Sequence, residues 1–135
     1  VKEIIFVKGN HDLVLGPIAE KRNIKIVNYY NIDDVSILHG HEIISDLKNT
    51  IIIGHEHPAV SFKEKKYEKY KCFLKGKWRR KELIAVPSFN PLLEGTDVLQ
   101  GTLLSPFLED ISKFSVYIVN KEEVFSFGKI KDLKI

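Results

Sequence analysis

The segment Thr50-Ile51-Ile52-Ile53-Gly54-His55-Glu56-His57 joins a short apolar run to a turn that carries two histidines. Three successive isoleucines favour a buried β-strand, and the glycine marks the point at which this strand ends. His55 and His57 therefore follow the carboxyl end of the strand, where open α/β sheets usually hold their ligands. The segment predicts an α/β fold with a polar site at one edge of its sheet.

Two further apolar runs end in the same way. Glu3–Val7 leads into Gly9-Asn10-His11-Asp12, and Val35–Leu38 leads into His39-Gly40-His41. Each run is typical of a strand that stops at a polar cluster containing glycine. We therefore expect three strand ends to bring the amide of Asn10 and four imidazoles, those of His11, His39, His55 and His57, to the same edge of the sheet.

These side chains have the chemistry of a metal site. Imidazole nitrogen and carboxamide oxygen suit borderline divalent ions such as manganese, iron or zinc better than the all-oxygen sites of calcium and magnesium do. Two histidines separated by one residue, as in His55 and His57, can reach two ions a few ångströms apart. Taken singly, Asn10 is typical of a turn and His39 of a hydrogen-bonded structural residue. His41 can be a structural residue, or it can lie next to the metal ligands or contact the substrate.

The rest of the chain alternates short predicted strands with loops. We expect a short helix from Gly16 to Arg22, because Pro17 suits the first position of a helix. A hairpin turn is predicted around Lys75-Gly76-Lys77, and residues 87–101 are predicted to form a loop. Further strands are predicted at Ile24–Tyr30, Leu83–Val86, Phe114–Val119 and Glu123–Phe127.

At the histidine motifs the sequence resembles the calcineurin-like metallophosphoesterases, whose signature includes Gly-Asn-His-Asp, a histidine before glycine, and Gly-His-x-His. It is most similar to the DNA-ligase-associated and DEAD/DEAH-helicase-associated phosphoesterases of archaea and bacteria. Residues Pro87–Gly95, which read Pro-Ser-Phe-Asn-Pro-Leu-Leu-Glu-Gly, are similar to a segment typical of that subgroup. The resemblance implies a metallophosphoesterase-type α/β fold, a two-sheet β-sandwich flanked by helices.

Two signature motifs of that family, Asp-x-His and Gly-Asp-x-x-Asp, do not occur in the 135 residues. In the family they lie upstream of Gly-Asn-His-Asp and supply aspartate ligands. The chain begins at Val1, close to an apolar run, and contains no methionine. We therefore expect residues 1–135 to be the C-terminal part of a single metallophosphoesterase domain. Its partners would then include the missing N-terminal segment of the same domain.

The resemblance also implies a ligand set for two divalent metal ions. Asn10, His39 and His55 match the side chains that hold the second ion, and His57 matches one ligand of the first. Manganese is favoured, with iron, nickel or zinc as the other candidates. We therefore expect a dinuclear metal centre in the intact domain.

Two further residues match catalytic positions of the family. His11 matches the histidine that protonates the leaving group, and Asp12 matches the residue that orients it through a hydrogen bond to its ring. An alternative interpretation is that Asp12 caps the following turn. The implied function is a metal-dependent phosphoesterase that hydrolyses phosphodiesters, including those of nucleic acid, with water activated between the ions. The alternative is a non-catalytic nucleic-acid-binding module that retains the fold.

Composition and charge bear on the cellular compartment and on the partners of the protein. Charged residues make up 29% of the chain, and no apolar run reaches the length of about 18 residues that spans a membrane. The single cysteine, Cys72, suits a reducing cytoplasm. A basic stretch, Lys63–Lys81, is interleaved with aromatic residues and predicts either a nucleic-acid contact or a solvated edge hairpin. The sequence does not indicate an oligomeric state.

Overall fold

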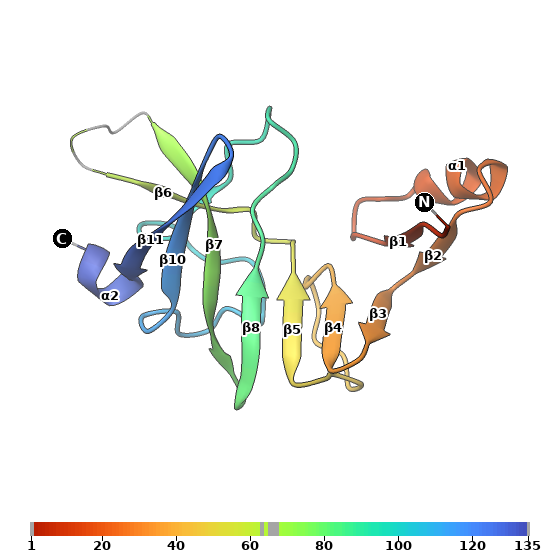
Figure 1. The fold of residues 1–135 in the computed structure, drawn as a ribbon, viewed down its shortest axis with the longest axis horizontal. Helices are drawn as coiled ribbons and strands as arrows, with labels where there is room; N and C mark the ends of the chain where they lie inside the picture. The colour runs from red at the N-terminus through yellow and green to blue at the C-terminus, as the bar shows by residue number, and fades with distance from the viewer. Residues whose placement is uncertain (1, 63, 65–67, 135) are drawn as a thin grey trace.

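The computed structural model describes residues 2–62, 64 and 68–134. It is a mixed α/β structure in which strands predominate, with two short helices in the described ranges (Figure 1). The elements in chain order are β1 (Ile5–Val7), α1 (Leu15–Lys21), β2 (Lys25–Val27), β3 (Tyr29–Ile32), β4 (Val35–Leu38), β5 (Thr50–Ile53), β6 (Pro58–Ser61), β7 (Lys69–Trp78), β8 (Lys81–Ala85), β9 (Thr96–Asp97), β10 (Ser115–Asn120), β11 (Glu123–Lys129) and α2 (Ile130–Leu133).

The main sheet has the strand order β11-β10-β7-β8-β5-β4-β3. Strands β4, β5 and β8 are parallel neighbours, so their carboxyl ends lie at the same edge of the sheet (Figure 1). The other neighbouring pairs are antiparallel. This topology places the residues that follow β4 and β5 side by side.

Strand β7 connects this sheet to a smaller group of strands. Its residues Lys69–Lys71 pair with β6, whereas its later residues pair with β8 and β10. Strand β6 also pairs in parallel with β9. All four residues of β6 are buried. The turn between β5 and β6 therefore leads from the main sheet to this smaller group of strands.

The core lies on the main sheet and under the chain segment that precedes β10. Ile51 and Leu83 are completely buried in β5 and β8. Phe107 and Phe114 from the covering segment are also buried, and the Phe107 ring lies 4.7 Å from the Trp78 ring. Burial of these apolar surfaces, at about 25 cal/mol per Å², is the main contribution to the stability of the sheet.

The N-terminal unit has fewer elements than the main sheet, and apolar side chains on it are exposed to solvent. It consists of the parallel pair β1–β2 and helix α1, of which only Ala19 is buried. Leu13 and Val14, which precede the helix, are 83% and 74% exposed. A two-stranded sheet is marginally stable by itself. Nowhere in the described ranges is there a helix of the length and apolar character needed to cross a membrane.

The predicted hairpin turn at Lys75-Gly76-Lys77 is wrong. Strand β7 continues through Gly76 to Trp78. The glycine serves packing and not a turn, because a side chain at this position would collide with the ring of Phe114. The turn lies instead at Arg79 and Arg80, which both adopt positive φ angles, 45° and 66°. The predicted strand Ile24–Tyr30 is likewise divided into β2 and β3.

Candidate metal centre

Three donor atoms converge from three strand ends. The Oδ1 atom of Asn10, in the turn after β1, lies 2.9 Å from Nε2 of His39, which follows β4. The same Nε2 atom lies 2.9 Å from Nδ1 of His55, which follows β5. The structure thus brings together the three residues that the resemblance assigns to one ion.

Backbone contacts explain this convergence. The amide groups of Gly54 and His55 both donate to the carbonyl oxygen of His39, at 2.9 and 2.8 Å, and this ties the end of β5 to the end of β4. On the other side, a Cβ atom at Gly9 would lie 3.2 Å from the His39 ring. The absence of a side chain at Gly9 lets the Asn10 turn approach the histidines closely.

Burial keeps these imidazoles neutral. It lowers the pKa of His39 to about 4, with further lowering from the neighbouring His55 and His41. Burial also lowers the pKa of His55, although the Glu56 carboxylate acts in the opposite direction. Both rings are therefore uncharged at pH 7, and each carries one nitrogen lone pair.

The donor chemistry of the cluster fits a divalent cation. A proton on Nε2 of His39 can be donated either to Asn10 Oδ1 or to His55 Nδ1. The remaining acceptor atom then faces Nε2 at 2.9 Å with no proton shared between the two atoms. A borderline ion that prefers imidazole nitrogen satisfies all three atoms at once. Counting only His, Cys, Asp and Glu, the described residues contain no group of three that could hold a metal. The third donor of this cluster is the amide oxygen of Asn10.

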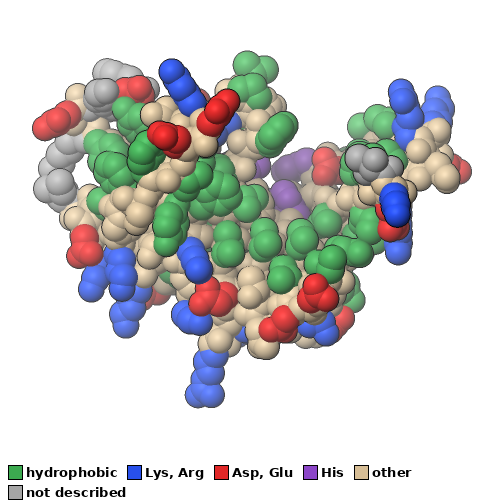
Figure 2. Space-filling model, viewed as in Figure 1, with side chains coloured by type: hydrophobic (Ala, Val, Ile, Leu, Met, Phe, Trp, Pro, Cys, Tyr) green, Lys and Arg blue, Asp and Glu red, His purple; other side chains and the backbone are tan. Residues whose placement is uncertain are grey.

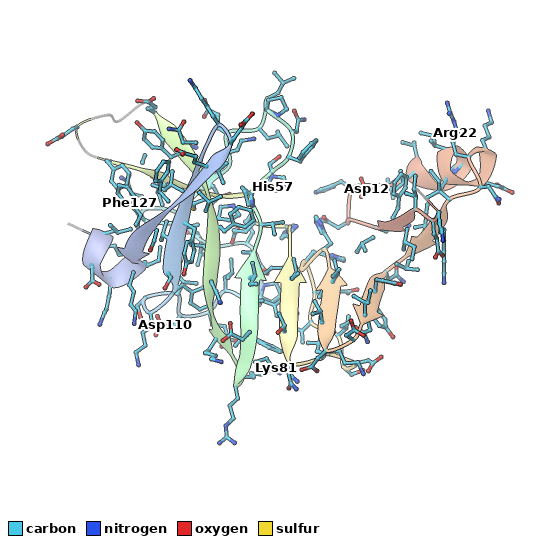
Figure 3. The ribbon with its side chains drawn as sticks, viewed as in Figure 1. Asp12, Arg22, His57, Lys81, Asp110 and Phe127 are labelled. Atoms are coloured by element: carbon cyan, nitrogen blue, oxygen red, sulfur yellow. The ribbon has the colours of Figure 1, made fainter. Side chains whose placement is uncertain are left out.

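His57 is held next to the cluster by its backbone. It has a positive φ of 50°, and its carbonyl oxygen accepts a hydrogen bond of 2.8 Å from the amide of Thr96 in β9. Its charge, when protonated, lowers the pKa of both His39 and His55. Figure 3 shows His57 on the side of the sheet and Asp12 across from it on the side of the N-terminal unit. The aspartates expected to complete a site at His57 are absent from the sequence.

His11 and Asp12 lie at the exposed rim. Nε2 of His11 is 3.3 Å from Nδ2 of Asn10. The expected hydrogen bond, in which Asp12 accepts from the His11 ring, does not form among the described residues. Asp12 instead accepts a bond of 2.7 Å from the amide of Gly9, because the tight turn brings that amide against its carboxylate. Asp12 therefore shapes the turn that presents Asn10 and His11.

Sequence reasoning missed Glu56, whose side chain is 1% exposed. Its Oε1 atom accepts bonds of 2.7 and 3.3 Å from the amides of Leu104 and Ser105, and Ser105 Oγ donates to the carbonyl oxygen of Gly40 at 2.6 Å. These bonds join the loop after β4 to the loop after β5. A carboxylate between two candidate ligands is the signal that could have identified this residue.

Histidine side chains gather in the hollow between the sheet and the N-terminal unit (Figure 2). A cavity of about 300 Å³ opens there, and Asn10, His39 and His41 contribute to its lining. The His41 ring lies 5.5 Å from the His39 ring and 6.2 Å from the His55 ring, so it borders the cluster. The cavity therefore opens beside two of the three donor residues, Asn10 and His39.

The predicted nucleic-acid stretch is divided between both ends of the sheet. Residues 63 and 65–67 lie outside the described part of the chain. Trp78 is buried and Tyr70 packs against the core, so these two aromatics belong to the fold. Lys77, Arg79 and the residues around them lie where β8 begins, at the opposite end from the histidines.

No known protein family matches the sequence, and no curated protein matches it. The structure is similar to the crystal structure of the Pseudomonas putida nuclease MPE, with a TM-score of 0.65 and 17% sequence identity. The match covers 93% of this chain and 54% of that chain. The present chain thus spans about half the length of that protein, and at this identity the similarity shows a shared fold.

Proposed function

We propose that the protein is a hydrolase, a divalent-metal-dependent phosphoesterase of the calcineurin-like metallophosphoesterase type. The observation that carries the proposal is the convergence of Asn10 Oδ1, His39 Nε2 and His55 Nδ1 at distances of 2.9 Å. A resemblance in three sequence motifs and a similar solved structure named as a nuclease support it. In this proposal the strands belong to a two-sheet sandwich and the protein works in the cytoplasm.

Asn10, His39 and His55 would hold one ion, with manganese as the favoured metal. A divalent ion at this position supplies positive charge that polarises a phosphoryl oxygen and makes water more acidic. The Glu56 and Ser105 hydrogen bonds keep the His39 and His55 loops in register, so the donor atoms are preorganised. His57 is the ligand proposed for a second ion, together with residues of a further segment of the domain.

His11 is the proposed general acid. It is exposed, and its neighbour Asn10, which lines the cavity, connects it to the donor cluster. A protonated imidazole at this place can donate its proton to the leaving oxygen of a phosphodiester as the P–O bond breaks. The Asp12 carboxylate fixes the turn through Gly9 and thereby the direction in which His11 projects.

The proposed substrates are phosphodiesters, with nucleic acid as the favoured class. The similar structure is named as a nuclease, which is a property of that protein. The exposed Leu13 and Val14 beside the cavity support a further partner, the N-terminal segment of the same domain, which would cover them. We propose that activity requires both parts.

The test uses the full-length protein that contains residues 1–135. Hydrolysis of a nitrophenyl phosphodiester is measured with and without Mn²⁺, and metal content is measured after dialysis. Metal-dependent turnover that disappears in His39→Ala supports the proposal. Metal-independent turnover, or full activity of His39→Ala, would exclude it. If neither the wild type nor any variant hydrolyses the ester but oligonucleotides bind, the protein is a binding module.

A further inference from the structure

The loop between β8 and β9, residues Pro87–Gly95, begins and ends beside the histidine-bearing turn. Just before the loop, the amide of Val86 donates to the carbonyl oxygen of Ile53 at 2.9 Å. Just after it, the amide of Thr96 donates to the carbonyl oxygen of His57 at 2.8 Å. The loop therefore spans the turn that carries His55, and it projects from the same edge of the sheet (Figure 1).

Apolar side chains on this loop project into solvent. Phe89 is 104% exposed and Leu92 is 87% exposed, although a folded chain normally covers side chains of this size. Phe89 is the most exposed of the large apolar residues that the structure describes. Apolar side chains gathered in the open next to a candidate site indicate a binding surface.

Hydrogen bonds from β7 hold the backbone on both sides of Phe89. The ammonium group of Lys71 donates to the carbonyl oxygens of Ser88 and Asn90, at 2.9 and 2.6 Å, and these residues flank Phe89 on either side. Lys69 donates to the carbonyl oxygen of Gly95 at 3.1 Å. The Phe89 ring is therefore presented by a braced backbone, and the positive charge of Lys71 lies against the carbonyl groups on either side of it.

We infer that Phe89 is a stacking platform for an unpaired nucleobase and that Lys71 attracts the adjoining phosphate. An aromatic face beside a cation matches the two parts of a nucleotide, and aromatic stacking accepts any base. Within the described residues Lys71 has no carboxylate partner, so its charge is available to an anion. The inference rests on the proposed phosphodiesterase function and assigns its substrate class as single-stranded nucleic acid.

The test measures binding of a fluorescein-labelled oligothymidylate by anisotropy, in EDTA and low salt, so that no hydrolysis occurs. Phe89→Ala should raise the dissociation constant by about 5- to 150-fold, the loss expected for one stacked base. Phe89→Tyr should restore the affinity to within about threefold, because it retains the aromatic face. Binding of a blunt duplex of matched length should be unaffected by either change.

Two matched controls sharpen this result. Phe125→Ala removes a 43% exposed aromatic on β11 and should leave oligothymidylate binding unchanged. Lys71→Gln should weaken binding and reduce the slope of log K against log salt by about 0.7, the value for one phosphate on a single strand. Lys77→Gln at the opposite end should change the slope less, because Lys77 is paired with Glu82.

The outcomes distinguish the inference from the function on which it rests. Unchanged affinity in Phe89→Ala, in a protein with metal-dependent esterase activity, overturns the stacking platform alone. If Phe89→Ala weakens oligothymidylate binding but the protein shows no metal-dependent turnover, the proposed phosphoesterase function alone is wrong. If Phe89→Ala instead abolishes self-association in sedimentation and leaves oligonucleotide binding intact, the loop is a protein interface and the inference is wrong. Circular dichroism of each variant confirms folding.

Discussion

The two ends of the parallel strands β4, β5 and β8 use their polar residues in opposite ways. At the carboxyl end, neutral imidazoles and an amide oxygen face one another at 2.9 Å without enough protons to satisfy them. At the other end, Lys77 is paired with Glu82 at 2.8 Å, and the Arg79 guanidinium lies 4.5 Å from the centre of the Trp78 ring. The Lys77 and Arg79 charges at the hairpin end already have partners, so binding chemistry is expected at the histidine end.

The electrostatics of the two ends agree with this contrast. Burial lowers the pKa of His39 to about 4, which keeps a lone pair free for a ligand. The hydrogen bond from Lys77 lowers the pKa of Glu82, which is solvent-exposed. Exposed pairs of this kind contribute little to stability and are weakened by salt. The number of charges in a stretch of sequence is therefore a poor guide to where it binds.

The largest expected effect comes from removing a donor atom of the cluster. His55→Ala and His39→Ala should each lose metal-dependent hydrolysis and lower Mn²⁺ affinity by more than about 100-fold, because a direct ligand contributes more than the groups that orient it. Metal affinity is measured by calorimetry on the full-length protein. The matched control is His41→Ala, whose ring borders the cluster but makes none of its close contacts. Equal losses in all three variants would show that the ligand set is wrong.

Replacement of His11 should separate catalysis from metal binding. His11→Ala should retain its metal but lose turnover on esters with alkoxide leaving groups by about 10²–10⁴-fold, as expected for loss of a general acid. An ester with a nitrophenolate leaving group should be affected much less, because that group departs without a proton. Rates on both esters, with metal content, provide the measurement. Equal slowing of the two esters, or loss of metal, would contradict the assignment of His11 as the acid.

The sequence predicted the histidine end well because its signals are local. Runs of β-branched residues that stop at glycine define β4 and β5, and their parallel pairing follows from an α/β fold. The approach of His39 and His55 then follows from strand ends that share one edge of the main sheet. The expected common edge is wrong for Asn10, because β1 pairs with β2 in a separate two-stranded sheet and Asn10 reaches the histidines from that unit.

The hairpin end was predicted less well because tertiary contacts determine it. Gly76 indicated a turn, but the ring of Phe114, which is distant in sequence, requires a glycine inside a continuous strand. Strand β6 was missed because its burial depends on pairing with β7 and β9. The burial of Glu56 depends on amides of residues 104 and 105, which no local pattern connects to it.

The role of Gly76 in packing can be tested through stability. Gly76→Ala should lower the free energy of unfolding by about 1–3 kcal/mol, because the added methyl group overlaps the Phe114 ring and the core must adjust. Chemical denaturation gives this value. Gly16→Ala is the matched control, since a Cβ there meets nothing within 4 Å and alanine favours the helix. If Gly76→Ala is neutral, the contact with Phe114 does not explain the glycine.

The smallest expected effect concerns the strained hairpin turn itself. Arg79 and Arg80 both occupy the left-handed region, which is unfavourable for residues other than glycine by about 1–2 kcal/mol. Arg80→Gly relieves this strain, but glycine also gains entropy in the unfolded chain, so a net stabilisation of about 0.5–1 kcal/mol is expected. Arg79→Gly additionally loses the cation–π contact with Trp78, worth about 0.5–1 kcal/mol, and should be close to neutral. Thermal unfolding followed by circular dichroism should therefore show a rise in the unfolding temperature of a few degrees for Arg80→Gly only.

Because the turn lies at the opposite end of the sheet from the histidines, neither change should alter Mn²⁺ affinity. A change in metal binding at either position would mean that the two ends are coupled through the sheet.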